Sequence, residues 1–251
     1  MINFRKRIAA AVLACCTAGS LCTGLPHAHS VSELTAQAAG TYQVEALNRG
    51  ISAVSTGSGM LVSWRFLAND PDQTVFRLYR DNQLIYTSEQ NMATCYLDAG
   101  GSAASAYRVD AVVDGKVVNS STCTMQSGAA YFDLPLDQPT SSGCTYSPND
   151  CTVGDVDGDG EYELFVKWDP SNSQDNSKAG KTDKVYIDCY KLNGKKLWRI
   201  DLGYNIRAGA HYTQMLVADF DLDGKAELTC KTADGTKDAV SYTHLRAHET
   251  G

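Results

Sequence analysis

An internal repeat in the second half of the chain restricts its fold more than any other feature of the sequence. The segments GDVDGDGEYELFVK and ADFDLDGKAELTCK match at seven positions, and their first aspartates, Asp155 and Asp219, lie 64 residues apart. A β-rich unit that recurs after some tens of residues is typical of propellers and solenoids. Between the copies, YIDCYKLNGKKLWRID predicts two strands joined at Asn193-Gly194, a dipeptide that favours hairpins. Each repeat therefore carries several strands, as a propeller blade does.

Residues 134–238 have room for about two such blades, whereas a propeller needs at least about four. We therefore expect this segment to be the first part of a larger propeller. The fold class predicted for the whole chain is all-β.

Each copy of the repeat opens with an acidic loop of the pattern DxDxDG. Aspartates at positions 1, 3 and 5 direct three carboxylates into one tight turn, and glycine at position 6 permits the sharp bend. Position 7 can offer its backbone carbonyl and position 9 a glutamate, which completes the all-oxygen ligand set that Ca²⁺ prefers. The predicted ligands are Asp155, Asp157, Asp159, Glu161 and Glu163 in the first loop, and Asp219, Asp221, Asp223, Lys225 and Glu227 in the second.

Two other interpretations of these loops are weaker. An EF-hand needs a bidentate glutamate at position 12, where the sequence has Val166 and Cys230, and the residues after each loop predict a strand and not a helix. A solvated acidic turn would leave four carboxylates close together in each loop. Since two like charges about 4 Å apart cost on the order of 4 kcal/mol at an effective dielectric of 20, a bound cation is favoured.

Residues 41–127 predict a separate β-sandwich. In GMLVSWRFL the residues Val62, Trp64 and Phe66 share one face of a strand, which is the alternation of a half-buried strand. Turn signals at Asp81-Asn82 and Asp114-Gly115 predict two hairpins. Several short strands at this spacing favour a sandwich, and the segment resembles a fibronectin type III domain.

The two ends of the chain do not belong to the predicted fold. Residues 1–30 carry a basic start, a short apolar run and small polar residues, which is the layout of a secretory signal peptide, so we expect a secreted protein. Residues 240–250 read VSYTHLRAHET, which resembles the translation of a sequencing adapter, and we interpret residues 240–251 as an artefactual tail. His244 and His248 within it are therefore not taken as a metal site.

Composition and cysteine usage narrow the function classes. The net charge of −7 argues against a surface that neutralises phosphates, so no nucleic-acid partner is expected. We expect no membrane association after the signal is removed, and a monomer. Six cysteines remain beyond the signal, and Cys144 and Cys151, which flank a loop, are the best candidates for a disulfide. No Cys/His spacing suggests zinc.

Five segments of the chain together resemble the rhamnogalacturonan lyases of polysaccharide lyase family 11. They are LNRG, VSWRFL, YSPNDCTVGDVDGDGEYELFVKWDPSNSQDNS, VYIDCYKLNGKKLWRIDLGYNIRAGAHYTQ and KTADGT. The resemblance covers nearly all of the chain between its two ends. It implies a β-sandwich that leads into an eight-bladed propeller with calcium ions. It also implies cleavage of the galacturonate–rhamnose backbone of the pectic polysaccharide rhamnogalacturonan I by β-elimination.

The resemblance implies further that Asn149 and Asp169 contact substrate, although a turn cap and a strand-end turn are the ordinary structural roles of such residues. Arg207 and His211 lie in a Gly/Ala-rich loop, where a structural hydrogen bond is the commoner role. The sequence offers no nucleophile–base pair, and no catalytic residue is assigned. Because the family's base region lies in later blades, we expect this piece alone to be inactive.

Two other function classes stay open at the level of sequence. The strand-turn-Trp unit KLNGKKLWRIDLG is similar to units of quinoprotein dehydrogenase propellers, although those lack the paired acidic loops. A non-enzymatic carbohydrate-binding or adhesion propeller with integrin-like calcium loops is the second alternative.

Overall fold

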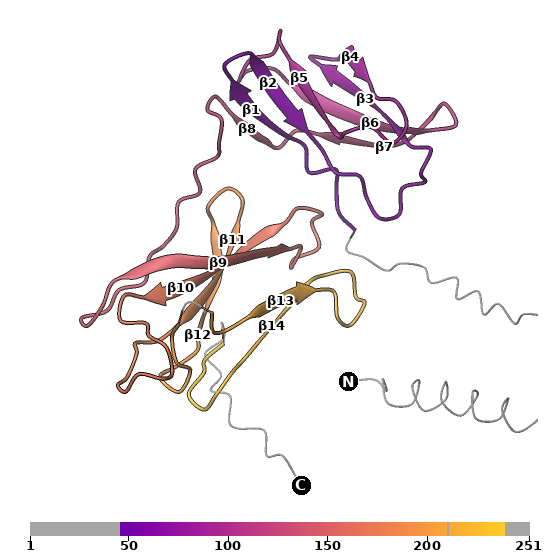
Figure 1. Ribbon diagram of the computed structural model, residues 1–251. Helices are drawn as coiled ribbons and strands as arrows, with labels where there is room; N and C mark the ends of the chain where they lie inside the picture. The colour runs from indigo at the N-terminus through magenta and orange to yellow at the C-terminus, as the bar shows by residue number, and fades with distance from the viewer. Residues whose placement is uncertain (1–45, 210, 239–251) are drawn as a thin grey trace, which may run out of the picture. The chain divides into compact units, whose positions relative to one another are not determined.

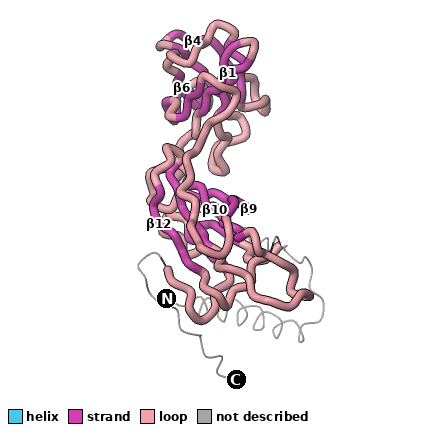
Figure 2. The backbone as a smooth tube through the Cα atoms, turned by 90° about the vertical axis from the view of Figure 1, so that its left-hand side faces the viewer, coloured by secondary structure: helices cyan, strands magenta, loops and turns pink. Residues whose placement is uncertain are grey.

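The computed structural model describes residues 46–209 and 211–238, and within these ranges the chain is built from strands and loops without a helix (Figure 2). The strands are β1 Ser52–Thr56, β2 Gly59–Ser63, β3 Val75–Arg80, β4 Gln83–Thr87, β5 Cys95–Asp98, β6 Tyr107–Val113, β7 Lys116–Thr122, β8 Met125–Ser127, β9 Tyr146–Gly154, β10 Glu163–Pro170, β11 Tyr186–Lys191, β12 Lys196–Asp201, β13 Met215–Ala218 and β14 Glu227–Cys230. The prediction of an all-β chain is confirmed for this part.

The first eight strands form two four-stranded sheets that share one core (Figure 1). One sheet has the order β5-β2-β1-β8 and the other β4-β3-β6-β7; β1 and β8 pair in parallel, and the other pairs are antiparallel. Val62 from the first sheet and Leu78 and Val109 from the second are fully buried in this core. The predicted alternation is confirmed for Val62 and Trp64, which are buried, and for Leu61, which precedes them and is exposed. Phe66, predicted on the same buried face, lies beyond the end of β2 and is 44% exposed, so the prediction was wrong for this residue.

A buried ion pair organises the start of this region. The side chain of Arg49, in the LNRG segment, is only 2% exposed and forms a two-point ion pair with Asp70. Its Nε also donates to Asn119 at 3.1 Å, and its guanidinium carbon lies 5.4 Å from the centre of the Phe76 ring. Because burying one of these charges alone would be costly, the two residues stabilise the fold as a unit.

Strands β9 to β12 form an antiparallel sheet in the order β12-β11-β10-β9. Apolar clusters cover both faces of the sheet, so β10 reads as a nearly continuous buried strand. Asp188 is fully buried on β11, where its carboxylate accepts hydrogen bonds from Trp168 and Tyr190 and pairs with Arg199. Four strands in sequential order are consistent with a propeller blade.

The two-stranded sheet β13–β14 packs beside β9 (Figure 1). Gly154, at the end of β9, has no room for a side chain, because an added Cβ would lie 2.4 Å from a methyl group of Val217. The amide of Ala226 donates to the carbonyl of Asp155 at 2.7 Å. These contacts place the second copy of the repeat directly against the first.

The turns follow the sequence predictions. Asp81 and Asn82 both have positive φ between β3 and β4, and Asp114 and Gly115 do so between β6 and β7, as two-residue hairpins require. Asn193-Gly194 joins β11 to β12, with Gly194 at φ 87°. All three hairpin predictions are confirmed.

The predicted signal peptide over residues 1–30 and the artefactual tail over residues 240–251, with its two histidines, lie outside the described residues. In the part of the chain that is described, no helix has the length and apolar character needed to cross a bilayer.

Candidate functional site

The first acidic loop connects β9 to β10 and is organised around Asp155, whose side chain is fully buried. One carboxylate oxygen accepts from the amides of Gly158 at 2.7 Å and Asp159 at 3.2 Å, and the other accepts from Gly160 at 2.8 Å. Gly158 and Gly160 have φ values of 78° and 86°, a conformation that glycine adopts without strain. Three amides therefore fix the direction in which this carboxylate points.

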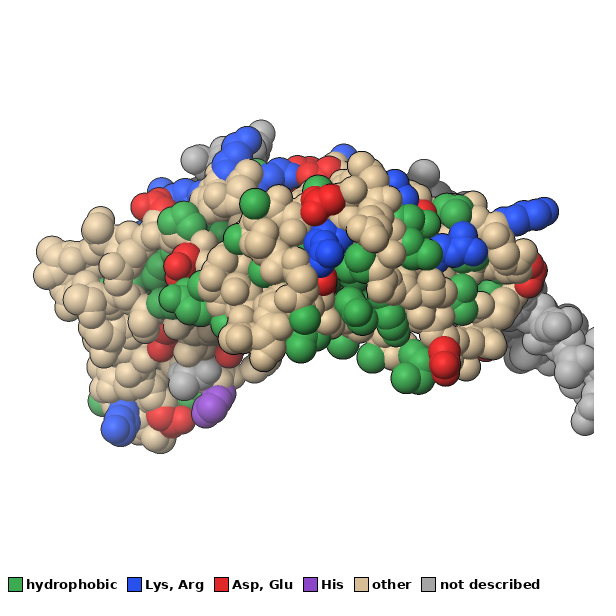
Figure 3. Space-filling model, turned by 90° about the horizontal axis from the view of Figure 1, so that it is seen from above, with side chains coloured by type: hydrophobic (Ala, Val, Ile, Leu, Met, Phe, Trp, Pro, Cys, Tyr) green, Lys and Arg blue, Asp and Glu red, His purple; other side chains and the backbone are tan. Residues whose placement is uncertain are grey.

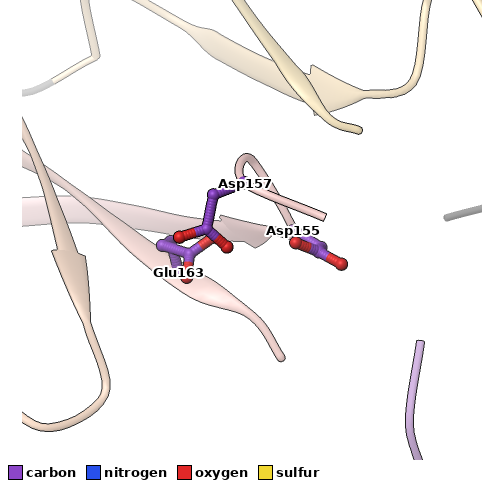
Figure 4. Close-up of side chains that lie close together, drawn as sticks. All are labelled: Asp155, Asp157 and Glu163. Carbon is purple, nitrogen blue, oxygen red and sulfur yellow. The ribbon is translucent and has the colours of Figure 1, made fainter. Parts of the chain in front are cut away.

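Two further carboxylates converge on Asp155. Oxygens of Asp155, Asp157 and Glu163 lie within 4.8 Å of one another, and Figure 4 shows these side chains where the loop meets β10. Glu163 is 1% exposed, and its Oε2 accepts from the amide of Val156 at 2.9 Å. Burial raises the pKa of Glu163, because an ionised carboxylate loses hydration there. A bound cation would compensate for that loss.

One lysine, which the sequence analysis did not single out, lies on the outer side of this loop. Lys191 Nζ is 2.7 Å from Asp157, 2.7 Å from Asp159 and 3.2 Å from Glu163. Its hydrogen bond lowers the pKa of Asp159, and the carboxylates in turn raise the pKa of Lys191. Lys191 is the cross-strand partner of Glu163, so only the β10–β11 register could have identified it.

The second acidic loop repeats the hydrogen bonds of the first. Asp219 accepts from the amides of Asp223 at 3.1 Å and Gly224 at 2.9 Å, and Glu227 accepts from Phe220 at 2.8 Å. The oxygens of Asp219, Asp221 and Glu227 again lie within 4.8 Å of one another, although these side chains are more exposed than those of the first loop. The repeat in sequence is therefore a repeat in side-chain geometry.

The structure brings together three of the five predicted ligands in each loop. Asp159 and Asp223 lie outside the clusters, because their carboxylates accept from the amides of Glu161 and Lys225 at 2.9 Å. The backbone carbonyls of Glu161 and Lys225 stay predicted ligands. The donor set of each cluster is all oxygen and converges on one point, which fits a hard divalent cation. The strand that follows each loop agrees with the rejection of an EF-hand.

Asn149 on β9 and Asp169 on β10 lie at the opposite end of the same strand pair. The register pairs Glu163 with Gly154 beside the acidic loop, and Asp169 with Ser147 at the far end. Asn149 is exposed, and its side-chain oxygen lies 2.8 Å from the amide of Asp150. Oδ1 of Asp169 is buried and has no hydrogen-bond partner among the described residues. A buried carboxylate oxygen without a partner is unfavourable, which makes Asp169 a candidate ligand contact.

Lys167, on β10, connects the Asn149 end of the sheet to the loop that contains Tyr212. Its side chain is 1% exposed, and Nζ lies 2.5 Å from Asp150 and 2.9 Å from the carbonyl of Tyr212. Asp150 follows Asn149 directly, so the buried ammonium helps to fix the chain beside Asn149. In the sequence, Lys167 matches Lys231 of the second repeat, but this match did not predict the contact of Lys167 with Asp150.

Arg207 has a structural role. Its guanidinium donates to the backbone carbonyls of Gln174, Asp175, Lys178 and Gly180 at 2.7 to 3.2 Å, and so holds the loop between β10 and β11 in shape. His211 is exposed, and its backbone carbonyl accepts from Gln214 at 3.3 Å. Neither residue lies in the two acidic clusters.

The candidate disulfide between Cys144 and Cys151 is not formed, and all six cysteines of the described residues are free. The seven-residue separation runs mostly along the extended strand β9, where each residue advances roughly 3.3 Å. A disulfide needs Cα atoms within about 7 Å. Strand formation therefore holds the two cysteines apart, and the prediction from loop spacing was wrong.

Comparison with known proteins relates the chain to one family. The family model described as "Rhamnogalacturonan I lyases beta-sheet domain" matches residues 42–126, and that described as "Rhamnogalacturonan lyase family 11, C-terminal domain" matches residues 131–244. The chain is 50% identical over 246 residues to the rhamnogalacturonan endolyase YesW of Bacillus subtilis (strain 168), a match that covers 96% of this chain and 38% of YesW. It is 52% identical over 206 residues to the rhamnogalacturonan exolyase YesX of the same organism, covering 80% of this chain and 34% of YesX.

Comparison of the structure with solved structures gives relatives of the same kind. The crystal structure of the exotype rhamnogalacturonan lyase YesX matches with a TM-score of 0.72 and 49% identity, over 81% of this chain and 35% of that one. The chain thus spans little more than a third of the length of the relatives that it matches.

Proposed function

The chain belongs to the rhamnogalacturonan lyases of family 11, and from this premise we propose that it is part of an enzyme that cleaves rhamnogalacturonan I. The reaction is β-elimination at the galacturonate–rhamnose backbone of this pectic polysaccharide. The 50% identity along 96% of the chain to an endolyase is the observation that carries the proposal. The net charge of −7 argues against a surface that neutralises the phosphates of a nucleic acid. On the face shown in Figure 3, both signs of charge are interspersed and not gathered into one basic patch.

The architecture that we propose is a fibronectin-III-like sandwich over residues 41–127, followed by the first blades of an eight-bladed propeller over residues 134–238. The four-stranded sheet β9–β12, with the second acidic repeat packed against it, supports this arrangement. We further propose that residues 1–30 are a secretory signal, that residues 240–251 are an artefact, and that the enzyme works outside the cell as a monomer.

We propose that each acidic loop binds one Ca²⁺. Asp155, Asp157 and Glu163 would hold the first ion, and the matching hydrogen bonds at the second loop support a second. The acidic loop and Asp169 lie at opposite ends of β10, about six residues or roughly 20 Å apart. An ion in the first loop is therefore too far from Asp169 to touch the same sugar, and we propose that the role of the ions is structural.

Calcium in the loops would stabilise the fold measurably. An extracellular site with Kd near ~10⁻⁴ M, in ~2 mM calcium, adds ~1.8 kcal/mol to the free energy of unfolding. Thermal unfolding of the chain in calcium and in excess chelator tests this. A higher midpoint in calcium is expected, with a smaller shift in each of the single variants Asp155→Asn and Asp219→Asn; equal midpoints of the unmodified chain in both solutions would remove the calcium proposal.

At the opposite end of β10, Asn149 and Asp169 are proposed to contact the polysaccharide. An exposed amide can hydrogen-bond sugar hydroxyls, and the free oxygen of Asp169 can accept from a hydroxyl group that reaches it. In β-elimination a base removes the proton at C5, and a cation on the uronate carboxylate would stabilise the charge that develops. No residue of the described chain is assigned as that base.

The activity is tested on the complete enzyme of which this chain is a part. Incubation with rhamnogalacturonan I should generate the ultraviolet absorbance of unsaturated uronate in the presence of calcium. Homogalacturonan, which lacks rhamnose, is the substrate control. The absence of new absorbance on rhamnogalacturonan I would contradict the lyase proposal.

A further inference from the structure

The contact between Lys191 and the first acidic loop follows from the sheet and not from a chance side-chain position. Lys191 is the last residue of β11 and pairs directly with Glu163, the first residue of β10. Backbone pairing therefore places the lysine stem beside the loop. Nζ lies within 3.2 Å of Asp157, Asp159 and Glu163, and the side chain is 23% exposed.

The first acidic loop carries more negative than positive charge. The loop gathers the carboxylates of Asp155, Asp157, Asp159 and Glu163, and Lys191 is the only basic side chain of the described residues within 4.0 Å of them. A single ammonium leaves the set with a net negative charge. Two of its three partners, Asp157 and Glu163, belong to the cluster that would hold a metal ion.

The second loop lacks this feature in the described part of the chain. No lysine or arginine there comes within 4.0 Å of the carboxylates of Asp219, Asp221 or Glu227. Two backbone hydrogen bonds are common to both loops: Gly160 and Gly224 donate to the first aspartate of their loops, and Val156 and Phe220 donate to the glutamate. The second loop is therefore an internal reference for the effect of Lys191.

We propose that Lys191 is a resident cation of the first loop, which holds its carboxylates together in the ion-free state and lowers the affinity of the loop for calcium. This inference rests on the proposed calcium binding. An ammonium a few ångströms from a divalent ion repels that ion and also occupies oxygens of Asp157 and Glu163 that the ion would use. Asp159, which lies outside the ligand cluster, can keep Lys191 in place when the ion enters.

Calcium titration by calorimetry on the full chain tests the affinity. Lys191→Met removes the charge and keeps the apolar stem. In this variant we expect one of the two sites to bind calcium at least about tenfold more tightly than in the unmodified chain, because the repulsion between the ammonium and the divalent ion is removed. Lys191→Arg, which keeps the charge, and Lys195→Met, which changes an exposed lysine of the following turn, should both stay within about threefold of the unmodified chain.

Thermal unfolding provides a second measurement. In excess chelator, Lys191→Met should lower the unfolding midpoint, since the carboxylates then repel one another without compensation. In saturating calcium its midpoint should recover, so that the shift caused by calcium is larger than in the unmodified chain. A lysine with a merely structural role would lower the midpoint equally in both solutions.

The outcomes separate this inference from the calcium proposal. If Asp157→Asn removes one calcium site and Lys191→Met leaves the remaining affinities unchanged or weaker, calcium binding stands and the role of Lys191 is overturned. If neither the unmodified chain nor Lys191→Met binds calcium, both proposals are wrong. Tighter binding by Lys191→Met together with a lower midpoint in chelator supports the inference.

Discussion

Asp188 shows how much one buried carboxylate can organise. Its oxygens accept from Trp168 Nε1 at 2.8 Å and from the Tyr190 hydroxyl at 2.6 Å, and they pair with Arg199 at 2.6 Å and 2.7 Å. Asp188→Ala removes the acceptor of Trp168 Nε1 and of the Tyr190 hydroxyl, and the buried ion-pair partner of Arg199. We expect the free energy of unfolding to fall by about 3–5 kcal/mol, the usual range when one partner of a buried ion pair is removed. Denaturant titration measures this loss.

The control for that variant is Asp137→Ala. The side chain of Asp137 is 61% exposed, and its ion pair with Lys196 lies at the surface. Its loss should cost under about 1 kcal/mol. Equal losses in the two variants would contradict the view that burial makes the Asp188 contacts important.

The cysteines differ in reactivity for the same reason. Burial raises the pKa of the Cys189 thiol to about 12, so that almost no reactive thiolate forms near neutral pH. Cys95 is exposed at the start of β5. Alkylation of the folded chain, followed by peptide mass mapping, should modify Cys95 and spare Cys189 until denaturant is added. Modification of both at the same rate would show that the β11 strand opens readily.

At the scale of elements, the two acidic loops respond differently to the same change. Gly160 and Gly224 both have positive φ, so alanine at either position is strained. A Cβ at Gly160 would also lie 3.2 Å from the carbonyl of Ala46 and the amide of Asn48, whereas Gly224 has open space. Gly160→Ala should therefore destabilise the chain by more than Gly224→Ala, with a cost of about 1 kcal/mol for the second. Thermal unfolding of both variants in chelator checks the order.

The elements and loops could largely be predicted from sequence because their signals are local. Each of these signals determines the local structure within a few residues. Examples are the alternation around Val62, the turn residues Asp81-Asn82 and the repeated aspartates of the acidic loops. Register is different, since it depends on how distant strands pair. The contact of Lys191 with Glu163 is a consequence of strand pairing and was not predicted. The separation of Cys144 from Cys151 follows from how far strand β9 extends, which the loop-spacing argument misjudged.

The site was predicted in part for a similar reason. The spacing of Asp155, Asp157 and Glu163 identified a cluster that the structure forms. Spacing did not show that the carboxylate of Asp159 turns toward Lys191, because that preference comes from a residue of another strand. The buried, unsatisfied oxygen of Asp169 likewise depends on packing around the end of β10 and has no signal in the sequence.

At the scale of the whole molecule, the described residues include the proposed sugar contacts but no assigned base. Asn149 and Asp169 are the proposed sugar contacts, and the buried ammonium of Lys167 already donates to Asp150 and to the carbonyl of Tyr212. These contacts hold Lys167 in a structural position, so we do not assign it as the group that removes the proton at C5. We propose that the base lies in the part of the family's length that this chain does not span.

We therefore expect the 251-residue chain, folded and loaded with calcium, to generate no unsaturated uronate from rhamnogalacturonan I. It should nevertheless bind the polysaccharide weakly, and Asp169→Ala should reduce that binding, because the chain keeps the proposed contacts at Asn149 and Asp169. Affinity electrophoresis measures the binding, and ultraviolet absorbance measures the cleavage. Asp137→Ala, which changes an exposed carboxylate outside the proposed contact, is the matched control. Turnover by the chain alone would mean that a base lies within residues 46–238 after all, with Lys167 the first residue to replace by methionine.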